Sequence, residues 1–271
     1  MAMQQDGGDS CDVETSGEAN ALGQEAHKLI LAREYDAARP IVERALALEP
    51  HNAMLAHTKA HLCTDSGAFE EGAAYLRSFL NEHDPFQGIN VHNAWHLAYM
   101  ELELGHPQAA LDWHRRVVAP TVGAMTFFSA VSLLWRMEVA GNGGPDLRSD
   151  WEILRRAALG AAGKSHLDDL GRAMAFIATG DEASLDRLLE RLDAAADNPV
   201  LAEVLRPLIE GLRAYWRGDF AAATRLIEPL VPSFRRLSEF TDQLTPALDT
   251  LEAARTRAFA AAAREATLQR P

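Results

Sequence analysis

The sequence predicts an all-α fold, built as a right-handed α-solenoid of tetratricopeptide-like helical hairpins. Three observations support this prediction. Apolar residues make up 48% of the chain but aromatic residues only 7%, a balance that suits helices packed through small side chains rather than a β-sandwich. A helix–turn–helix pattern recurs from about residue 21 to residue 120. No stretch of useful length shows the strict alternation that is typical of a β-strand.

Three successive hairpin units carry the recurring pattern. A small residue stands early in the second helix of each unit, at Ala38, Gly72 and Ala110, close to the period of about 34 residues of a tetratricopeptide repeat. The prolines that close the units are Pro50, Pro85 and Pro120. Small residues let neighbouring helices cross closely, and in such arrays the first helix of each unit lines the concave surface. We therefore expect the first helices to carry any binding site.

Beyond Pro120 the pattern loosens, although helices are still expected. They are predicted over 126–139, 150–161, 167–178, 181–195, 201–217, 221–230 and 244–266, and the last is expected to cap the array. Gly141-Asn142-Gly143-Gly144-Pro145 predicts a break. Residues 1–19 are rich in Gly, Ser and acidic residues, so we predict a disordered leader. We expect residues 20–271 to form a single helical-repeat domain, regular over 20–120 and looser over 121–271.

Charge and composition exclude several classes of function. The net charge of −13 argues against nucleic-acid binding, which needs a basic surface. No apolar run approaches the roughly 20 residues of a membrane span, and the leader lacks the apolar segment of a signal peptide. Cys11 and Cys63 do not make a disulfide framework. We expect a cytoplasmic protein without nucleic-acid or membrane partners.

Two pairs of histidines are the main candidates for a functional site. His57 and His61 are spaced i, i+4, as are His92 and His96, so each pair lies on one face of its helix. Both pairs fall on first helices of adjacent units, which pack about 8–10 Å apart. Nine of the ten histidines lie within residues 27–114. The four side chains are therefore expected to share one pocket.

Three interpretations of these histidines remain open. They can be buried polar residues satisfied by neighbouring hydrogen bonds. They can be ligands of a divalent metal such as zinc or iron, for which neutral imidazoles at i, i+4 are a common arrangement; the metalloprotease motif is absent, because Thr58 and Asn93 stand where it requires Glu. They can also serve metal-free acid/base catalysis or bind a polar or anionic small molecule.

Four further residues are candidate ligand-binding groups. Trp95 offers a wall for a planar or cationic ligand, although an aromatic residue in a repeat helix also serves packing. Asn93 can bind a ligand or orient a histidine, and Arg136 can bind an anion or pair with a carboxylate. Tyr99, one turn after Trp95, completes the set. These residues do not identify a cofactor, and a divalent metal is one candidate.

The histidine motifs and their surroundings resemble the tetratricopeptide repeat domain 38 family. The resemblance covers about residues 37–257 and is carried by His57-Thr58, Ala60-His61, His92-Asn93, Trp95-His96, Leu104-Gly105, Ala109-Ala110-Leu111 and Ser132-Leu133-Leu134-Trp135-Arg136. It implies an all-helical array in which the histidine motifs are shared features of a family without one well-defined activity. The chain is short for the family, which implies missing repeats on its N-terminal side. This shortening leaves one end of the groove open or frees it to form a homodimer.

The chain departs from the family pattern at two positions. Ser129 stands where the family usually has Asp, and Gly171 stands where it tends to have His. These departures imply that any polar site common to the family is altered here. Two classes of function follow from the sequence. The first is a binding protein with a His- and Trp-lined concave groove for a small molecule or peptide. The alternative is an enzyme of a specialised biosynthetic pathway that uses the paired histidines for acid/base or metal-assisted chemistry.

Overall fold

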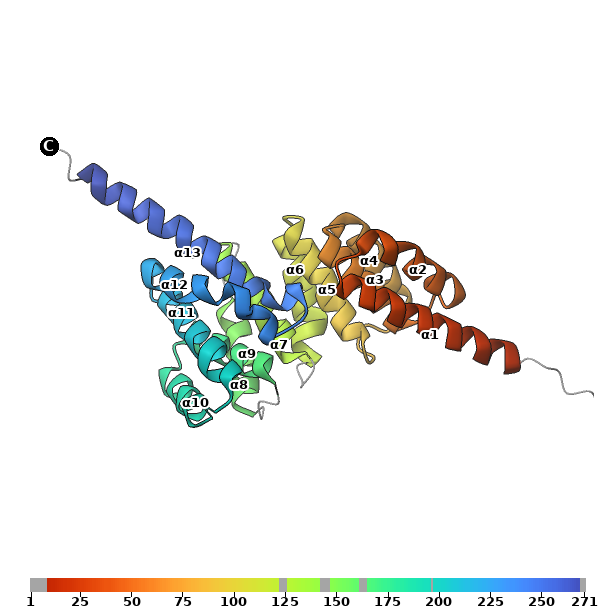
Figure 1. The fold of residues 1–271 in the computed structure, drawn as a ribbon, viewed down its shortest axis with the longest axis horizontal. Coiled ribbons are helices and arrows are strands. Elements are labelled where there is room, and N and C mark those ends of the chain that lie inside the picture. The colour runs from red at the N-terminus through yellow and green to blue at the C-terminus, as the bar shows by residue number, and fades with distance from the viewer. Residues whose placement is uncertain (1–8, 122–125, 142–146, 161–164, 196, 269–271) are drawn as a thin grey trace, which may run out of the picture. The chain divides into compact units, whose positions relative to one another are not determined.

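The computed structural model describes residues 9–121, 126–141, 147–160, 165–195 and 197–268, and every regular element among them is a helix (Figure 1). The prediction of an all-α fold is confirmed, whereas the handedness of a solenoid stays a prediction. The chain divides into two compact units, 1–106 and 107–271. The sequence predicted one domain whose regularity changes after residue 120; the division in the structure falls earlier, between the two helices of the third predicted hairpin.

The first unit consists of two helical hairpins followed by one further helix. Its helices are α1 (Asp9–Leu31), α2 (Tyr35–Leu48), α3 (Ala53–Ser66), α4 (Phe69–Glu82) and α5 (Asn90–Glu103). Each helix packs against the next, and α3 also contacts α1 and α5. Helix α3 therefore lies at the centre of the packing in this unit, with α1, α2, α4 and α5 as neighbours (Figure 1).

Part of the predicted disordered leader is helical, so that prediction is corrected for residues 9–19. Helix α1 begins at Asp9, and residues 1–8 lie outside the described part of the chain. Ala19 is fully buried and packs in one apolar cluster with Ala45 of α2 and Leu55 of α3. Composition indicated low hydrophobicity in this segment, but the segment is continuous with the part of α1 that Ala19 anchors against α2 and α3.

The ends of α3 are defined by residues whose type suits their positions. The side chain of Asn52 accepts hydrogen bonds from the backbone N–H groups of Met54 at 2.9 Å and Leu55 at 3.2 Å, which caps the start of the helix. Gly67 ends it in the left-handed conformation, with φ of 76°, where glycine has no steric cost. These caps fix where α3 begins and ends, and His57 and His61 lie on successive turns between them.

The second unit contains the remaining helices, which agree closely with the predicted ranges. They are α6 (Pro107–Trp113), η1 (His114–Val118), η2 (Ala119–Thr121), α7 (Phe127–Val139), α8 (Arg148–Gly160), α9 (His166–Thr179), α10 (Glu182–Ala194), η3 (Leu201–Leu205), α11 (Arg206–Trp216), α12 (Phe220–Ile227), η4 (Glu228–Arg236) and α13 (Thr241–Leu268). Four of the five residues of the predicted break over 141–145 lie outside the described residues.

Helix α7 of the second unit packs against α8, α9 and α13. Trp135 is fully buried there, and its indole N–H donates a hydrogen bond of 2.8 Å to the Thr250 hydroxyl. Its ring also contacts those of Trp151 and Trp216. Within the described residues, no helix of either unit is both long enough and apolar enough to cross a bilayer.

We predict that Gly72→Ala destabilises the protein, by about 1–3 kcal/mol. A Cβ atom at this position would lie 2.5 Å from Met100 Sδ and 2.7 Å from Cys63 Cβ, so α4 would have to move away from both α3 and α5. The measurement is the free energy of unfolding from a urea titration.

Gly17→Ala is the matched control, because a Cβ atom there would meet nothing within 4 Å. Alanine favours helix over glycine by about 1 kcal/mol at an exposed position, so this variant should be as stable as the wild type or more stable. Equal destabilisation by the two substitutions would contradict close packing at Gly72.

Candidate metal centre

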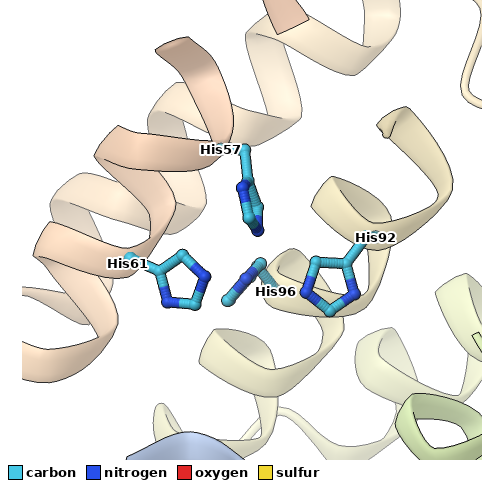
Figure 2. Close-up of side chains that lie close together, drawn as sticks. All are labelled: His57, His61, His92 and His96. Carbon is cyan, nitrogen blue, oxygen red and sulfur yellow. The ribbon is translucent and has the colours of Figure 1, made fainter. Parts of the chain in front are cut away.

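The four predicted histidines lie together in the first unit. His57 and His61 project from α3 and His92 and His96 from α5, and the four rings point toward one another across the space between the two helices (Figure 2). Each residue offers one nitrogen, and these four nitrogens all lie within 4.8 Å of one another. The expected convergence of the two pairs is therefore present.

The rings are in direct contact in several directions. The ring centroids of His57 and His61 are 4.5 Å apart, and those of His92 and His96 are 4.8 Å apart. Between the helices, the His61–His96 distance is 4.6 Å and the His57–His92 distance is 5.0 Å. The contacts across the gap are thus as close as those within each helix, and the four imidazoles form one cluster.

The cluster is largely buried between the two helices, and the expected concave groove stays a prediction. His61 is 2% exposed and His96 is fully buried, whereas His57 and His92 are half-buried. The reason is that α5 packs directly against α3, so that the faces predicted to line a groove cover each other. Access to the cluster is therefore limited to the side on which its half-buried members lie.

Burial keeps the four imidazoles neutral. Loss of hydration lowers the pKa of His57 to about 3, with a further contribution from the nearby His92, and lowers the pKa of His92 to about 4. Burial, followed by repulsion from the other histidines, holds the pKa of His61 and of His96 well below the usual value. A neutral imidazole has a nitrogen lone pair, which is the form that binds metal ions.

Neighbouring side chains orient two of the rings. The Thr64 hydroxyl lies 3.4 Å from Nδ1 of His96, and this contact allows the tautomer in which Nδ1 carries the proton and Nε2 the lone pair. Trp95 is 1% exposed and stacks on His92, with centroids 5.0 Å apart and an angle of 17° between the rings. Trp95 thus packs against a member of the cluster, and its contact with a ligand stays a prediction.

The composition of the cluster is unusual because it contains only nitrogen donors. Among the described residues, neither a carboxylate nor a thiolate lies within the group of four. Cys63 is buried on α3, and burial raises the pKa of its thiol to about 11, so it stays protonated at neutral pH. Any ion held here would be bound by neutral ligands alone.

The other candidate residues have structural contacts. Asn93 is fully buried, and its amide donates a hydrogen bond of 3.1 Å to the Ala53 carbonyl, which ties α5 to the start of α3. Tyr99 is buried against Trp95, with ring centroids 5.8 Å apart. Arg136 belongs to the second unit, where its Nε donates to Asp249 at 2.6 Å. Their proposed contacts with a ligand stay predictions.

The two departures from the family pattern also lie in the second unit. Ser129 is buried on α7. Gly171 lies where α9 approaches α7 closely, because a Cβ atom there would be 3.1 Å from Cε1 of Phe127 and 3.4 Å from Cδ2 of Phe128. The space next to Gly171 is thus filled by aromatic rings, and a larger residue would require them to move.

A comparison of the sequence with models of known protein families finds no match, so the family resemblance stays a prediction.

Three further features of the first unit were not predicted. His27 on α1 contacts His61, with ring centroids 6.0 Å apart, and a pocket between α1 and α3 adjoins His57. In addition, His51, Glu82 and His83 form a second, more exposed group with ligand atoms within 4.8 Å. His27 stands 34 residues before His61, which is one repeat period, so the repeat register was the signal that could have placed it beside the pairs.

We predict that the metal-free protein loses stability as the pH falls from about 6.5 toward 4. The pKa values of His57, His61, His92 and His96 are lower in the folded chain than the ordinary value of 6.5. The unfolded chain therefore binds more protons in this interval. Each additional proton makes the free energy of unfolding fall by about a further 1.4 kcal/mol per pH unit as the pH decreases. Urea midpoints in the presence of a chelator measure this dependence.

The His57→Gln variant should show a shallower pH dependence, since it removes one of these groups. Lys59→Gln is the control, because it changes a charge on the same helix without removing an imidazole. A slope that is identical in His57→Gln and the wild type would contradict the lowered pKa.

Proposed function

We propose that the first unit is a metal-binding helical-repeat module in which His57, His61, His92 and His96 hold one divalent first-row transition metal ion. The observation that carries this proposal is the convergence of four nitrogens within 4.8 Å. A metal bound by imidazoles has metal–nitrogen distances of about 2.0–2.1 Å. The rings must turn inward to bring nitrogens with this spread onto one ion.

The donor set defines the class of metal. Imidazole suits zinc, copper, iron and nickel, whereas calcium and magnesium prefer oxygen ligands. The four rings are neutral because burial lowers their pKa, so no proton has to leave before an ion binds near neutral pH. These properties favour a borderline transition metal over a hard cation.

A purely structural role explains the cluster less well. Burying a polar group without a hydrogen bond is unfavourable by about 1–3 kcal/mol, and Nε2 of His57 is buried without a hydrogen bond to the described residues. Apolar side chains of similar size would fill the same space without this cost. Metal coordination supplies the partner that such a nitrogen lacks.

Metal-free acid/base catalysis is also supported less well. An efficient general base has a pKa near the operating pH, but the pKa of His57 is about 3 and that of His92 about 4. Imidazoles with such values are weak bases at neutral pH. We therefore favour metal-assisted binding of a small molecule over the enzyme that uses free histidines, and over a peptide-binding groove.

Metal titration of the tag-free protein tests the proposal. The His51→Gln/His83→Gln variant removes the second, exposed histidine group and serves as the background. We expect it to bind one equivalent of Co²⁺ with visible absorption bands, and one equivalent of Zn²⁺ by calorimetry. Adding His92→Ala should weaken binding by more than about 100-fold, because loss of an outer-shell partner alone weakens metal binding by about 10–100-fold.

His106→Gln is the matched control, since this imidazole is exposed and pairs with Glu101 outside the cluster. It should leave the stoichiometry and the affinity unchanged. Absence of Co²⁺ and Zn²⁺ binding to a folded protein with all four histidines would contradict the proposed function.

A further inference from the structure

The pocket beside the histidine cluster lies between α1 and α3 and has a volume of about 510 Å³, within the range of small-molecule sites. His57 lines it and is also a member of the cluster. His27 lies on the α1 side of the pocket and contacts His61. The pocket thus opens beside the half-buried side of the cluster, where a ligand can approach it.

The charge of the centre determines which ligands fit. Four neutral imidazoles leave the two positive charges of a divalent ion uncompensated, and among the described residues the cluster includes no carboxylate. A buried net charge is strongly unfavourable unless it is paired. An anion from outside the protein can provide this compensation, and the pocket beside the cluster has room for it.

The residues that line the pocket favour an anion with a charged end and an apolar body. Lys28 and His27 offer donors, Asn20 and Gln24 are polar, and Leu55 and Met54 are apolar. Within the described residues Lys28 makes no ion pair. Arginine is absent from the lining, and the first N–H groups of α3 are already bonded to Asn52, so the usual features of a phosphate site are missing.

We propose that this pocket binds a small organic monocarboxylate beside the metal centre, with Lys28 at its charged end and Leu55 along its apolar part. This inference rests on the proposed function, because the metal supplies part of the attraction. It assigns the pocket a ligand with one negative charge and an apolar body, and it gives Lys28 a binding role that the histidine motifs alone do not indicate.

Carboxylate titration of the full chain loaded with one equivalent of Co²⁺ tests this proposal, in the His51→Gln/His83→Gln background. Hexanoate should change the visible Co²⁺ spectrum and bind at least about tenfold more tightly than acetate, because its additional methylene groups are buried. Lys28→Gln should weaken hexanoate binding about fivefold, as expected for a partly exposed ion pair, while Co²⁺ affinity stays unchanged.

Lys59→Gln is the matched control. Lys59 is on α3, the other helix that borders the pocket, but it pairs with Glu71 at 3.3 Å and does not line the pocket, so hexanoate affinity should not change. Equal affinity for acetate and hexanoate, tighter binding of inorganic phosphate, or no effect of Lys28→Gln would overturn the carboxylate pocket.

The failures of the two proposals can be told apart. A chain that binds Co²⁺ but not hexanoate retains the metal centre and loses the carboxylate pocket. A chain that binds no Co²⁺ loses the metal centre, and the pocket is then tested alone by the melting temperature. The pocket is rejected if hexanoate raises the melting temperature of the wild type no more than it raises that of Lys28→Gln.

Discussion

The first unit depends on the close packing of two helices whose facing surfaces carry four imidazole rings. Helices α3 and α5 could bury leucines at these positions and gain hydrophobic stabilisation; instead they bury neutral histidines, and the ring centroids of the four closest pairs are 4.5–5.0 Å apart. The surrounding packing must hold these rings in place. Thr64 lies beside His96, Trp95 stacks on His92, and Asn93 ties α5 to α3. The candidate site is therefore an internal feature of the repeat packing.

Small residues make this packing close enough. Gly72 lets α4 lie against both α3 and α5, and Ala19, Ala26 and Ala38 are fully buried where α1 and α2 meet the rest of the unit. Because helices separated by small side chains approach closely, side chains from neighbouring hairpins reach a common point. The same residues that identify a helical repeat in the sequence thus determine the geometry of the histidine cluster.

Much of the fold could be predicted from the sequence, because helix periodicity and turn residues are local signals. The helix expected over 126–139 is α7 (Phe127–Val139), and that expected over 167–178 is α9 (His166–Thr179). The convergence of the histidines was also predictable, since i, i+4 spacing and repeat register determine the face of a helix. Their burial was not, because it depends on how α5 packs on α3. The helix over residues 9–19 was missed because low hydrophobicity in this segment indicated disorder. The contact of His27 with His61 was missed although the two residues are 34 positions apart, one repeat period.

The two histidine groups of the first unit differ in what a bound ion would require. The group of His51, Glu82 and His83 is mainly exposed and includes a carboxylate, so water and Glu82 can compensate the charge of an ion. The buried group has neither source of compensation within the cluster. A divalent ion there is stabilised by nitrogen coordination but leaves a net charge in a region of low dielectric. Binding of the metal and of an anion in the adjoining pocket should consequently favour each other, because each reduces the electrostatic cost of burying the other.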